Sequence, residues 1–424
     1  MQLRLSVFTP HRNSAINRAV AKFFRRGLSA LNGAVPGSPS LLVRACENQH
    51  DVFSSAFSIL RESITQRAFP AASVAVTHRG KLVALEAFGH FTYGPTSPGA
   101  PSFSRAVRGG GDFAVTPATL FDLASVSKVI ATTAMAMILY ERGVLDLEAP
   151  VAAIIPEFTA ASPETKQDSR RREVTLHMLL AHASGLPAYE KLFLKARTRD
   201  ELLHAAFTTP LTADPGSRAE YSDIGFIVVG VALERLSGES LDRFCQREIF
   251  GPLGMSTTAF RPPPEMRVHI PPTVNDQTLR HRIIQGEVHD ENASVLGGVA
   301  GHAGVFSTAE DVAQFAHGIL NGGHPILRRE TISLFTRRED KPQGTSRALG
   351  WDTPSHPSQS GKYFSDASFG HLGYTGTSLW IDPERQLSVT LLTNRTWPDC
   401  SSQAIKTVRP RFHDAVIEVL ENSG

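Results

Sequence analysis

Ser125 and Lys128 stand three positions apart, a spacing that can activate a serine hydroxyl for nucleophilic attack. Apolar residues at helical spacing continue from there to Tyr140, and Gly143 is a stop signal just beyond. We therefore expect a buried helix that begins near Ser125 and brings the lysine nitrogen to the same face as the hydroxyl. An N-cap serine followed by a surface lysine has the same spacing, so the pair needs support from the rest of the chain.

Two other stretches hold residues of the types that acyl transfer uses. Tyr221-Ser222-Asp223 follows the turn Asp214-Pro215-Gly216. His371-Leu372-Gly373-Tyr374 leads into a strand that we expect over residues 375–380. Rival chemistries are not supported, because the chain has no G-x-S-x-G, H-E-x-x-H or G-x-x-x-x-G-K-[ST] motif.

In order and spacing, these three stretches resemble the three motifs of the serine β-lactamase and penicillin-binding-protein superfamily. The match is closest to the branch that holds class C β-lactamases, D-Ala-D-Ala carboxypeptidases, D-aminopeptidases and related esterases. The resemblance covers about residues 51–420. Four further stretches are similar to that branch: Phe121-Asp122-Leu123-Ala124, the run 179–186, the run 250–255 and Gly304-Val305-Phe306-Ser307-Thr308.

The resemblance implies a role for each motif residue. Ser125 would be the acylated nucleophile, and Lys128 and Tyr221 would share the base role, which requires a lowered pKa in one of them. Tyr221 would also be the base for the water that releases the acyl group. The backbone N–H groups of Ser125 and Tyr374 would hold the oxyanion. The remaining motif residues would contact the substrate: Asp223, His371 and Gly373.

Two motif positions depart from the β-lactamase pattern. His371 stands where β-lactamases usually have lysine, and a histidine is mostly neutral at pH 7 unless a neighbour raises its pKa. Asp223 stands where they commonly have asparagine, and an ionised carboxylate cannot donate a hydrogen bond to a substrate carbonyl. It could instead pair with Lys128 or with a substrate amine. Both departures argue against efficient antibiotic hydrolysis.

The stretch 286–292 has residue types that ligate metals, but S-x-x-K chemistry needs none, so we expect neither a metal nor a cofactor. A loop that lines the pocket, or a turn held by salt bridges, is the favoured interpretation. We expect His182 and His302 to be packed and hydrogen-bonded rather than catalytic. Gly301 and Gly304 are expected to serve backbone geometry.

Composition limits the choice of partners. The 424 residues are 41% hydrophobic with a net charge of +2, which is ample for a large core and gives no reason to expect nucleic acid. No apolar run approaches the ~18 residues of a membrane span. The three cysteines form neither a disulfide framework nor a metal site: Cys46, Cys245 and Cys400. The expected partner is a small-molecule or peptide substrate, with the oligomeric state left open.

Residues 1–50 are predicted to be a poorly ordered basic extension, because their apolar part is too broken for a signal peptide. This favours a cytoplasmic location, or a periplasmic or secreted one if the true N-terminus differs. A catalytic domain is expected over residues 51–420. Its sheet part would take about 51–120 and 290–420, and its helical part about 121–289.

We therefore expect an α/β (α+β) fold of the β-lactamase/transpeptidase type, with an antiparallel sheet flanked by helices and a mostly helical insertion. The expected function is that of a serine hydrolase acting on an amide or ester, such as a peptidoglycan fragment or a D-amino-acid peptide. Two alternatives stay open: a carboxylesterase with broad small-ester specificity, and a catalytically weak binding or scaffold protein on the same fold.

Overall fold

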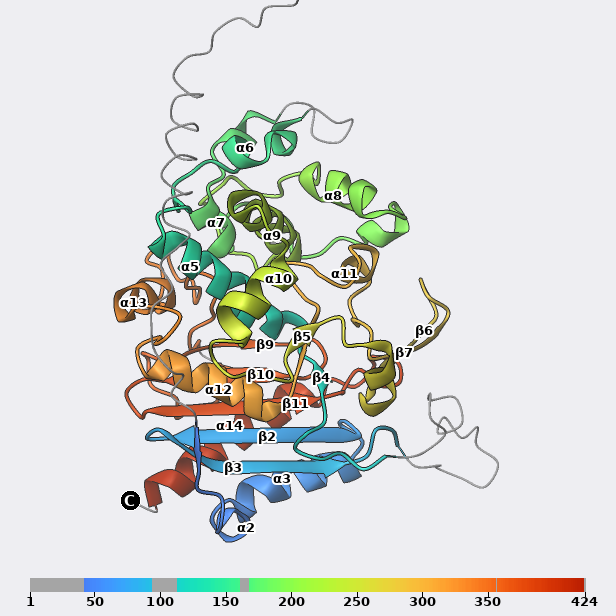
Figure 1. The fold of residues 1–424 in the computed structure, drawn as a ribbon, viewed down its shortest axis with the longest axis vertical. Coiled ribbons are helices and arrows are strands. Elements are labelled where there is room, and N and C mark those ends of the chain that lie inside the picture. Colours follow the sequence, from blue (N-terminus) through green and yellow to red (C-terminus); the bar gives the residue numbers. More distant parts are fainter. Residues whose placement is uncertain (1–41, 94–112, 161–167, 356, 423–424) are drawn as a thin grey trace, which may run out of the picture.

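A six-stranded sheet drawn from both ends of the chain forms the base of the molecule (Figure 1). The structure, a computed structural model, describes residues 42–93, 113–160, 168–355 and 357–422. The strand order is β1-β3-β2-β11-β10-β9, and neighbours are antiparallel except for β1, which runs parallel to β3. The bounds are β1 (Val43–Arg44), β2 (Ala71–His78), β3 (Lys81–Gly89), β9 (Phe369–Leu372), β10 (Ser378–Asp382) and β11 (Leu387–Thr393).

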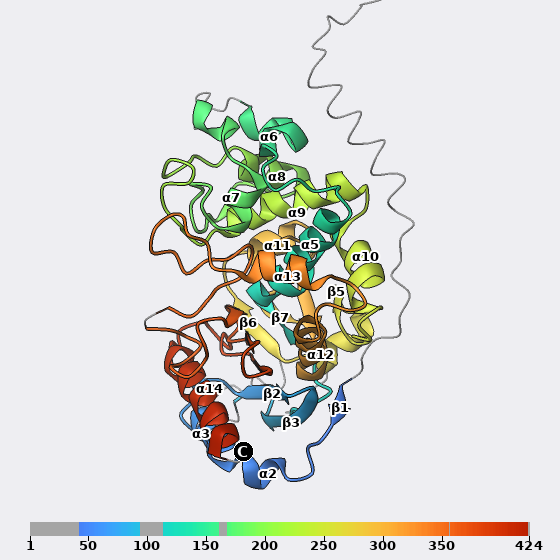
Figure 2. The same cartoon turned by 90° about the vertical axis from the view of Figure 1, so that its left-hand side faces the viewer.

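Alternate side chains of the central strand β2 point into two different cores. Ala71 and Ala75 face the helical part of the molecule, whereas Val74 and Val76 face the opposite side. Because both faces of the sheet are covered here, apolar residues occupy β2 on both sides. The helices that cover the two faces are α3 (Ser54–Thr65) and α14 (Ile405–Asn422) on one side and α12 (Ala309–Leu320) on the other (Figures 1 and 2).

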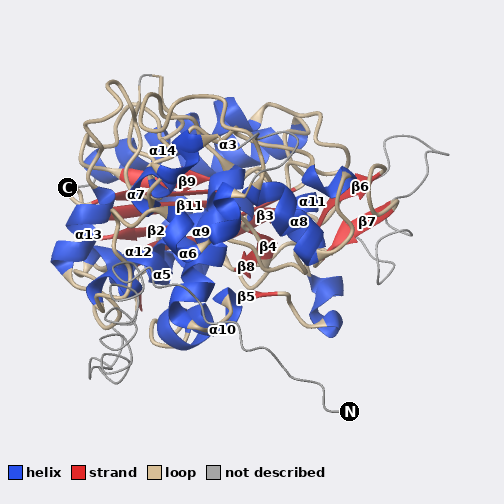
Figure 3. Ribbon diagram, turned by 90° about the horizontal axis from the view of Figure 1, so that it is seen from above, coloured by secondary structure: helices blue, strands red, loops and turns tan. Residues whose placement is uncertain are grey.

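The middle of the chain is mostly helical and lies beyond α12, over that face of the sheet (Figures 1 and 3). Its helices are α5 (Ala134–Glu141), α6 (Val151–Ile154), α7 (Leu176–Leu180), α8 (Arg199–Phe207), α9 (Asp223–Ser237), α10 (Leu241–Cys245), α11 (Glu291–Val295) and α13 (Arg329–Thr336). Shorter helical turns join them: η3 (Pro156–Thr159), η4 (Ser169–Arg172), η5 (Leu192–Leu194), η6 (Gln246–Phe250) and η7 (Pro264–His269). Helix α2 (Gln49–Val52) precedes α3.

Helix ends follow the capping chemistry of the sequence. The Thr175 side chain accepts a hydrogen bond from the N–H of Met178 at the start of α7, and Thr308 does the same for Asp311 at the start of α12. Helix α9 ends at Gly238, which has φ +70°. Each of these boundaries is therefore set by a residue type that favours a helix end.

Two small sheets accompany the six-stranded sheet in the described part of the chain. Strand β8 (Val305–Ser307) pairs with β4 (Phe121–Asp122) and with β5 (Ala259–Phe260). A separate hairpin is formed by β6 (Pro272–Asp276) and β7 (Arg282–Gln285). The pairing of β4 with β8 brings the segment that leads to Ser125 against the segment that follows the glycine-rich run 297–304.

The predicted fold class is confirmed: an antiparallel sheet carries helices on both faces and a mostly helical middle. Two details differ from expectation. Residues 42–50 hold β1 and α2, although we assigned them to the extension; the rest of that extension, residues 1–41, lies outside the described residues. His371 lies on its own strand, β9, instead of leading directly into β10. This strand has only four residues and contains Gly370, so it gave no strand pattern.

Candidate active site

Ser125 lies on a tight turn, where we expected the start of a regular helix. The turn η1 (Ala124–Val126) is followed by the wider helical segment η2 (Lys128–Thr133), and α5 begins only after it. Ala124 has φ +47°, a conformation that alanine rarely adopts. Its N–H donates to Oδ1 of the buried Asp122 at 2.8 Å, which helps to hold the strained backbone.

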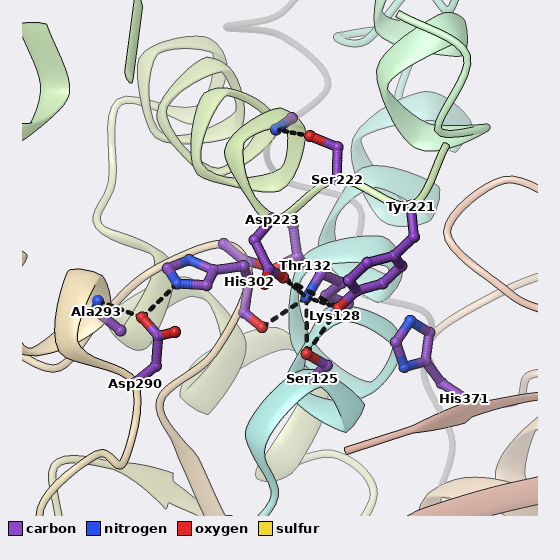
Figure 4. Close-up of polar contacts among 12 residues, drawn as sticks. Ser125, Lys128, Thr132, Tyr221, Ser222, Asp223, Asp290, Ala293, His302 and His371 are labelled. Atoms are coloured by element: carbon purple, nitrogen blue, oxygen red, sulfur yellow. Dashed lines mark hydrogen bonds and ion pairs between the residues drawn. The ribbon is translucent and has the colours of Figure 1, made fainter. Parts of the chain in front are cut away.

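The side chains of Lys128 and Tyr221 both contact the Ser125 hydroxyl, and Asp223 contacts both of them (Figure 4). Lys128 Nζ lies 3.0 Å from Ser125 Oγ, 2.6 Å from the Tyr221 hydroxyl and 2.7 Å from Asp223 Oδ1. The Tyr221 hydroxyl is 2.8 Å from Ser125 Oγ and 3.0 Å from Asp223 Oδ1. Lys128 is fully buried and also donates to the carbonyl of His302 at 3.0 Å. The structure thus brings the first and second motifs together, as the resemblance implied.

The electrostatic environment separates the two base candidates. Burial lowers the pKa of Lys128, while the Asp223 carboxylate opposes this shift. Burial raises the pKa of Tyr221 well above its ordinary value, and the charge of Asp223 raises it further. A neutral amine on Lys128 is therefore more accessible than a phenolate on Tyr221. The opposite directions of these two pKa shifts favour Lys128 over Tyr221 as the group whose pKa is lowered.

Asp223 pairs with Lys128, one of the two partners that we considered for it. It lies at the N-terminus of α9, where Ser222 caps the helix by accepting from the N–H of Gly225. Its ion pair with Lys128 keeps the lysine nitrogen beside Ser125, because that nitrogen has acceptors on two sides.

The turn between β9 and β10 is tied to the strand before Ser125 by two threonine hydroxyls. Thr375 Oγ1 donates to the carbonyl of Asp122 at 2.8 Å, and Thr377 Oγ1 donates to the carbonyl of Leu123 at 2.9 Å. Both contacts are buried. They fix the backbone around Tyr374 relative to the backbone of Ser125, which is the relation that two N–H donors to one oxyanion require.

The other two residues of the third motif, His371 and Gly373, have different roles in the structure. His371 is buried, and its Nδ1 lies 2.8 Å from the carbonyl of Leu372. Burial and the charge of Lys128 lower its pKa well below the ordinary value, so the imidazole is neutral and supplies no fixed charge. Gly373 lines the same pocket, but a Cβ there would come within 1.9 Å of Thr377 Oγ1. Its small size is needed for the turn itself.

The histidines expected to be structural have packing partners. His182 is buried and its Nδ1 accepts from the N–H of Ser222 at 3.0 Å, with its ring 4.8 Å from that of Tyr221. His302 Nε2 lies 2.8 Å from Asp290 Oδ1. Both histidines are therefore buried and hydrogen-bonded, as expected.

The stretch 286–292 is a packed loop beside the site. Asp290 caps α11 by accepting from the N–H of Ala293, and the N–H of His289 donates to Asp122 Oδ2 at 2.6 Å. Among the described residues, no group of three His, Cys, Asp or Glu side chains is placed to hold a metal ion. Nor does any helix within the described ranges have the length and apolar character needed to cross a bilayer.

Ser125, Tyr221, His371 and Tyr374 line one pocket of about 1060 Å³. Charged groups of both signs also line it, among them Arg347, whose guanidinium lies 5.5 Å from the centre of the Tyr221 ring. A pocket of this size accommodates far more than a small acyl group.

Several groups at the site were not found from the sequence. Asp122 was quoted as part of a similar stretch without a role, although it links the backbones of Ala124 and His289. The anchoring hydroxyls of Thr375 and Thr377 act on backbone carbonyls more than 250 positions away. No spacing in a single sequence reports such contacts.

Known proteins resemble this chain in sequence and in fold. A family model described as Beta-lactamase matches residues 56–407. The curated Escherichia coli (strain K12) protein "Putative D-alanyl-D-alanine carboxypeptidase" is 32% identical over 317 residues, which are 66% of this chain and 70% of that protein.

Solved structures share the fold at lower identity. EstCE1, described as a hydrolase with promiscuous acyltransferase activity, is 21% identical with a TM-score of 0.68, over 87% of this chain and 99% of that one. The octameric penicillin-binding protein homologue from Pyrococcus abyssi is 20% identical with a TM-score of 0.62, over 86% of this chain and 77% of that one. At such identities the likeness concerns the fold alone.

Proposed function

Because the chain belongs to the β-lactamase family and is a serine hydrolase, we propose that it cleaves an amide or ester through an acyl-enzyme on Ser125. The substrates that we propose are peptidoglycan fragments or D-amino-acid peptides, attacked in the manner of a carboxypeptidase or amidase. Two observations support this substrate class. The curated relatives are described as carboxypeptidases, and the pocket is large and lined by both acidic and basic side chains.

One observation carries the proposal. The Ser125 hydroxyl lies within hydrogen-bond distance of both Lys128 Nζ and the Tyr221 hydroxyl, in a site where burial lowers the pKa of the lysine. A serine that only capped a helix would need neither contact. A nucleophile and its base within reach, with the base oriented by a third group, is the arrangement that covalent catalysis requires.

The proposed reaction uses these contacts in sequence. Ser125 Oγ attacks the substrate carbonyl carbon while its proton passes to Lys128, directly or through the Tyr221 hydroxyl. The new oxyanion accepts hydrogen bonds from the N–H groups of Ser125 and Tyr374. When the tetrahedral intermediate collapses, the leaving amine or alcohol takes the proton back. Water then attacks the acyl-enzyme, the carboxylic acid leaves, and the Ser125 hydroxyl is restored.

A turnover panel tests the substrate class. The wild type and Ser125→Ala would each be tested for hydrolysis of five substrates. These are a peptide ending in D-Ala-D-Ala, its L-Ala-L-Ala counterpart, a muramyl peptide, a p-nitrophenyl ester and a cephalosporin. Ser58→Ala is a matched control, because its hydroxyl bonds only to the carbonyl of Ser54 on the exposed side of α3. We expect hydrolysis of a D-configured or muramyl substrate, lost in Ser125→Ala and kept in Ser58→Ala.

Other outcomes separate the alternatives. Turnover restricted to the ester would point to the broad-specificity esterase and contradict the peptidase proposal. Acylation without release in every case would point to the binding or scaffold protein. Turnover that survives in Ser125→Ala would contradict the mechanism itself.

A further inference from the structure

Arg409, on α14, is a buried charge next to the proposed oxyanion site that the mechanism above does not use. Its side chain is 5% exposed, and its Nη2 donates to the carbonyl of Gly373 at 2.7 Å and to that of Thr377 at 2.9 Å. These two carbonyls bracket the turn that carries Tyr374. The guanidinium therefore holds both ends of that turn.

The position of the first carbonyl matters chemically. The C=O of Gly373 and the N–H of Tyr374 belong to the same planar peptide group. A charge-assisted hydrogen bond to the carbonyl oxygen polarises the peptide and makes its N–H a stronger donor. The N–H that would face the oxyanion is thus coupled through one amide to a buried positive charge.

In the part of the chain that the structure describes, no carboxylate pairs with the Arg409 guanidinium. Within the described residues, neither Arg409 nor its neighbour Arg395 forms an ion pair; Arg395 Nε donates to the carbonyl of Tyr374 at 2.7 Å. Burial and the charge of Arg395 lower the pKa of Arg409 to about 9. Burying an unpaired guanidinium costs desolvation free energy, and two hydrogen bonds to carbonyls recover only part of that cost. A role in stability alone therefore does not account for the buried charge.

We propose that Arg409 is a positioning residue that strengthens the oxyanion donor of Tyr374 through the Gly373–Tyr374 peptide group. This inference rests on the proposed function, since it requires an acyl-enzyme on Ser125. Arg409 lines the edge of the same pocket, but its hydrogen bonds go to the carbonyls of Gly373 and Thr377, and the proposed effect acts through the Tyr374 N–H.

The chain provides a matched control in Arg171. This residue is 1% exposed, donates only to the carbonyls of Phe158, Thr209 and Phe207, and forms no ion pair among the described residues. Burial lowers its pKa to about 10. It lies in the helical part and does not line the active-site pocket, so its removal has a comparable structural cost without the proposed catalytic one.

The test compares Arg409→Gln, Arg409→Lys and Arg171→Gln. The first readout is the carbonyl stretch of the acyl-enzyme, measured by infrared difference spectroscopy with a 13C-labelled acyl group. Weaker donation to the acyl oxygen moves this band to higher wavenumber. The second readout is kcat per acylatable site, with KM. Removing a direct oxyanion donor costs about 100- to 1000-fold in kcat, so an indirect loss of roughly 10-fold is expected.

The expected result is a band at higher wavenumber and a kcat about 10-fold lower in Arg409→Gln, a smaller change of the same sign in Arg409→Lys, and neither change in Arg171→Gln. An unshifted band in Arg409→Gln would overturn the inference. If that variant does not fold, an unshifted band in Arg409→Lys would do so. No acyl band in the wild type would instead overturn the proposed function, and this inference with it.

Discussion

Lys128 has more acceptors around it than a neutral amine can serve. Ser125 Oγ, the Tyr221 hydroxyl, Asp223 Oδ1 and the His302 carbonyl all lie within 3.0 Å of its nitrogen. An ammonium can donate three hydrogen bonds, and a neutral amine only two. The site is therefore balanced between the charged form, which Asp223 favours, and the neutral form, which burial favours.

Replacing Asp223 by asparagine would move this balance. The carboxylate raises the pKa of Lys128, so its removal lowers that pKa and makes the neutral amine available at lower pH. We expect the acid limb of the pH profile of kcat/KM to shift to lower pH in Asp223→Asn. The measurement is kcat/KM from pH 4 to 9, with Asp214→Asn as control, because that side chain is largely exposed. A shift to higher pH would contradict the assignment of Lys128 as base.

At the scale of elements, the site depends on how β4, η1 and the β9–β10 turn are joined. Two threonine hydroxyls on that turn bond the backbone of β4 and of the residue that follows it. Arg409 also holds this turn, through hydrogen bonds to the carbonyls of Gly373 and Thr377. The distance between the two proposed oxyanion donors is thus set by contacts among three segments that are far apart in the sequence.

Thr377→Val removes one of these contacts without changing the shape of the side chain. The carbonyl of Leu123 would lose its buried donor, which typically costs about 1–3 kcal/mol of stability. We expect kcat to fall by roughly 10-fold with little change in KM, because an oxyanion donor acts mainly in the transition state.

Thr390→Val is the matched control for that variant. Thr390 is buried on β11, and its hydroxyl has no hydrogen-bond partner among the described residues. The same substitution there should leave kcat unchanged. Equal losses of kcat in the two variants would mean that general packing of the sheet, rather than the tie to Leu123, sets the rate.

Elements with local signals were predictable, and those held by distant contacts were not. Helix α7 begins at its capping threonine Thr175 and α9 ends at Gly238, because capping is decided by neighbouring residues. The strained turn at Ala124 was not predicted, since it is held by the Asp122 carboxylate and by the pairing of β4 with β8. Ser125, Lys128 and Tyr221 could be identified because they stand in recognisable sequence motifs. Arg409 could not, because its contact with Gly373 joins residues 36 positions apart.

At the scale of the whole molecule, the fold buries several histidines in neutral form. Burial lowers the pKa of His289 to about 4 and that of His413 to about 3, and it lowers the pKa values of His182 and His371 well below the ordinary value. The unfolded chain binds protons at these residues below about pH 6.5, whereas the folded chain does not. The stability that these residues confer is present above pH 6.5 and is lost as the pH falls.

We therefore expect the free energy of unfolding to decrease from pH 7 to pH 5, by up to about 1.4 kcal/mol per pH unit for each buried histidine. Asp122 opposes this trend in part, because burial raises its pKa to about 6 and the folded state then gains a proton in the same range. Urea unfolding at half-unit steps of pH measures the slope. His413 does not line the pocket, and His413→Gln should flatten the slope; an unchanged slope would contradict the assignment.

The most direct test of the central claim is the intact mass of the protein after treatment with a fluorophosphonate. We expect one adduct on the wild type and on Ser58→Ala, and none on Ser125→Ala, because only a hydroxyl next to a base in this site is activated. Circular dichroism would verify that each variant is folded. A folded wild type without adduct, or an equal adduct on Ser125→Ala, would contradict the assignment of Ser125 as the nucleophile.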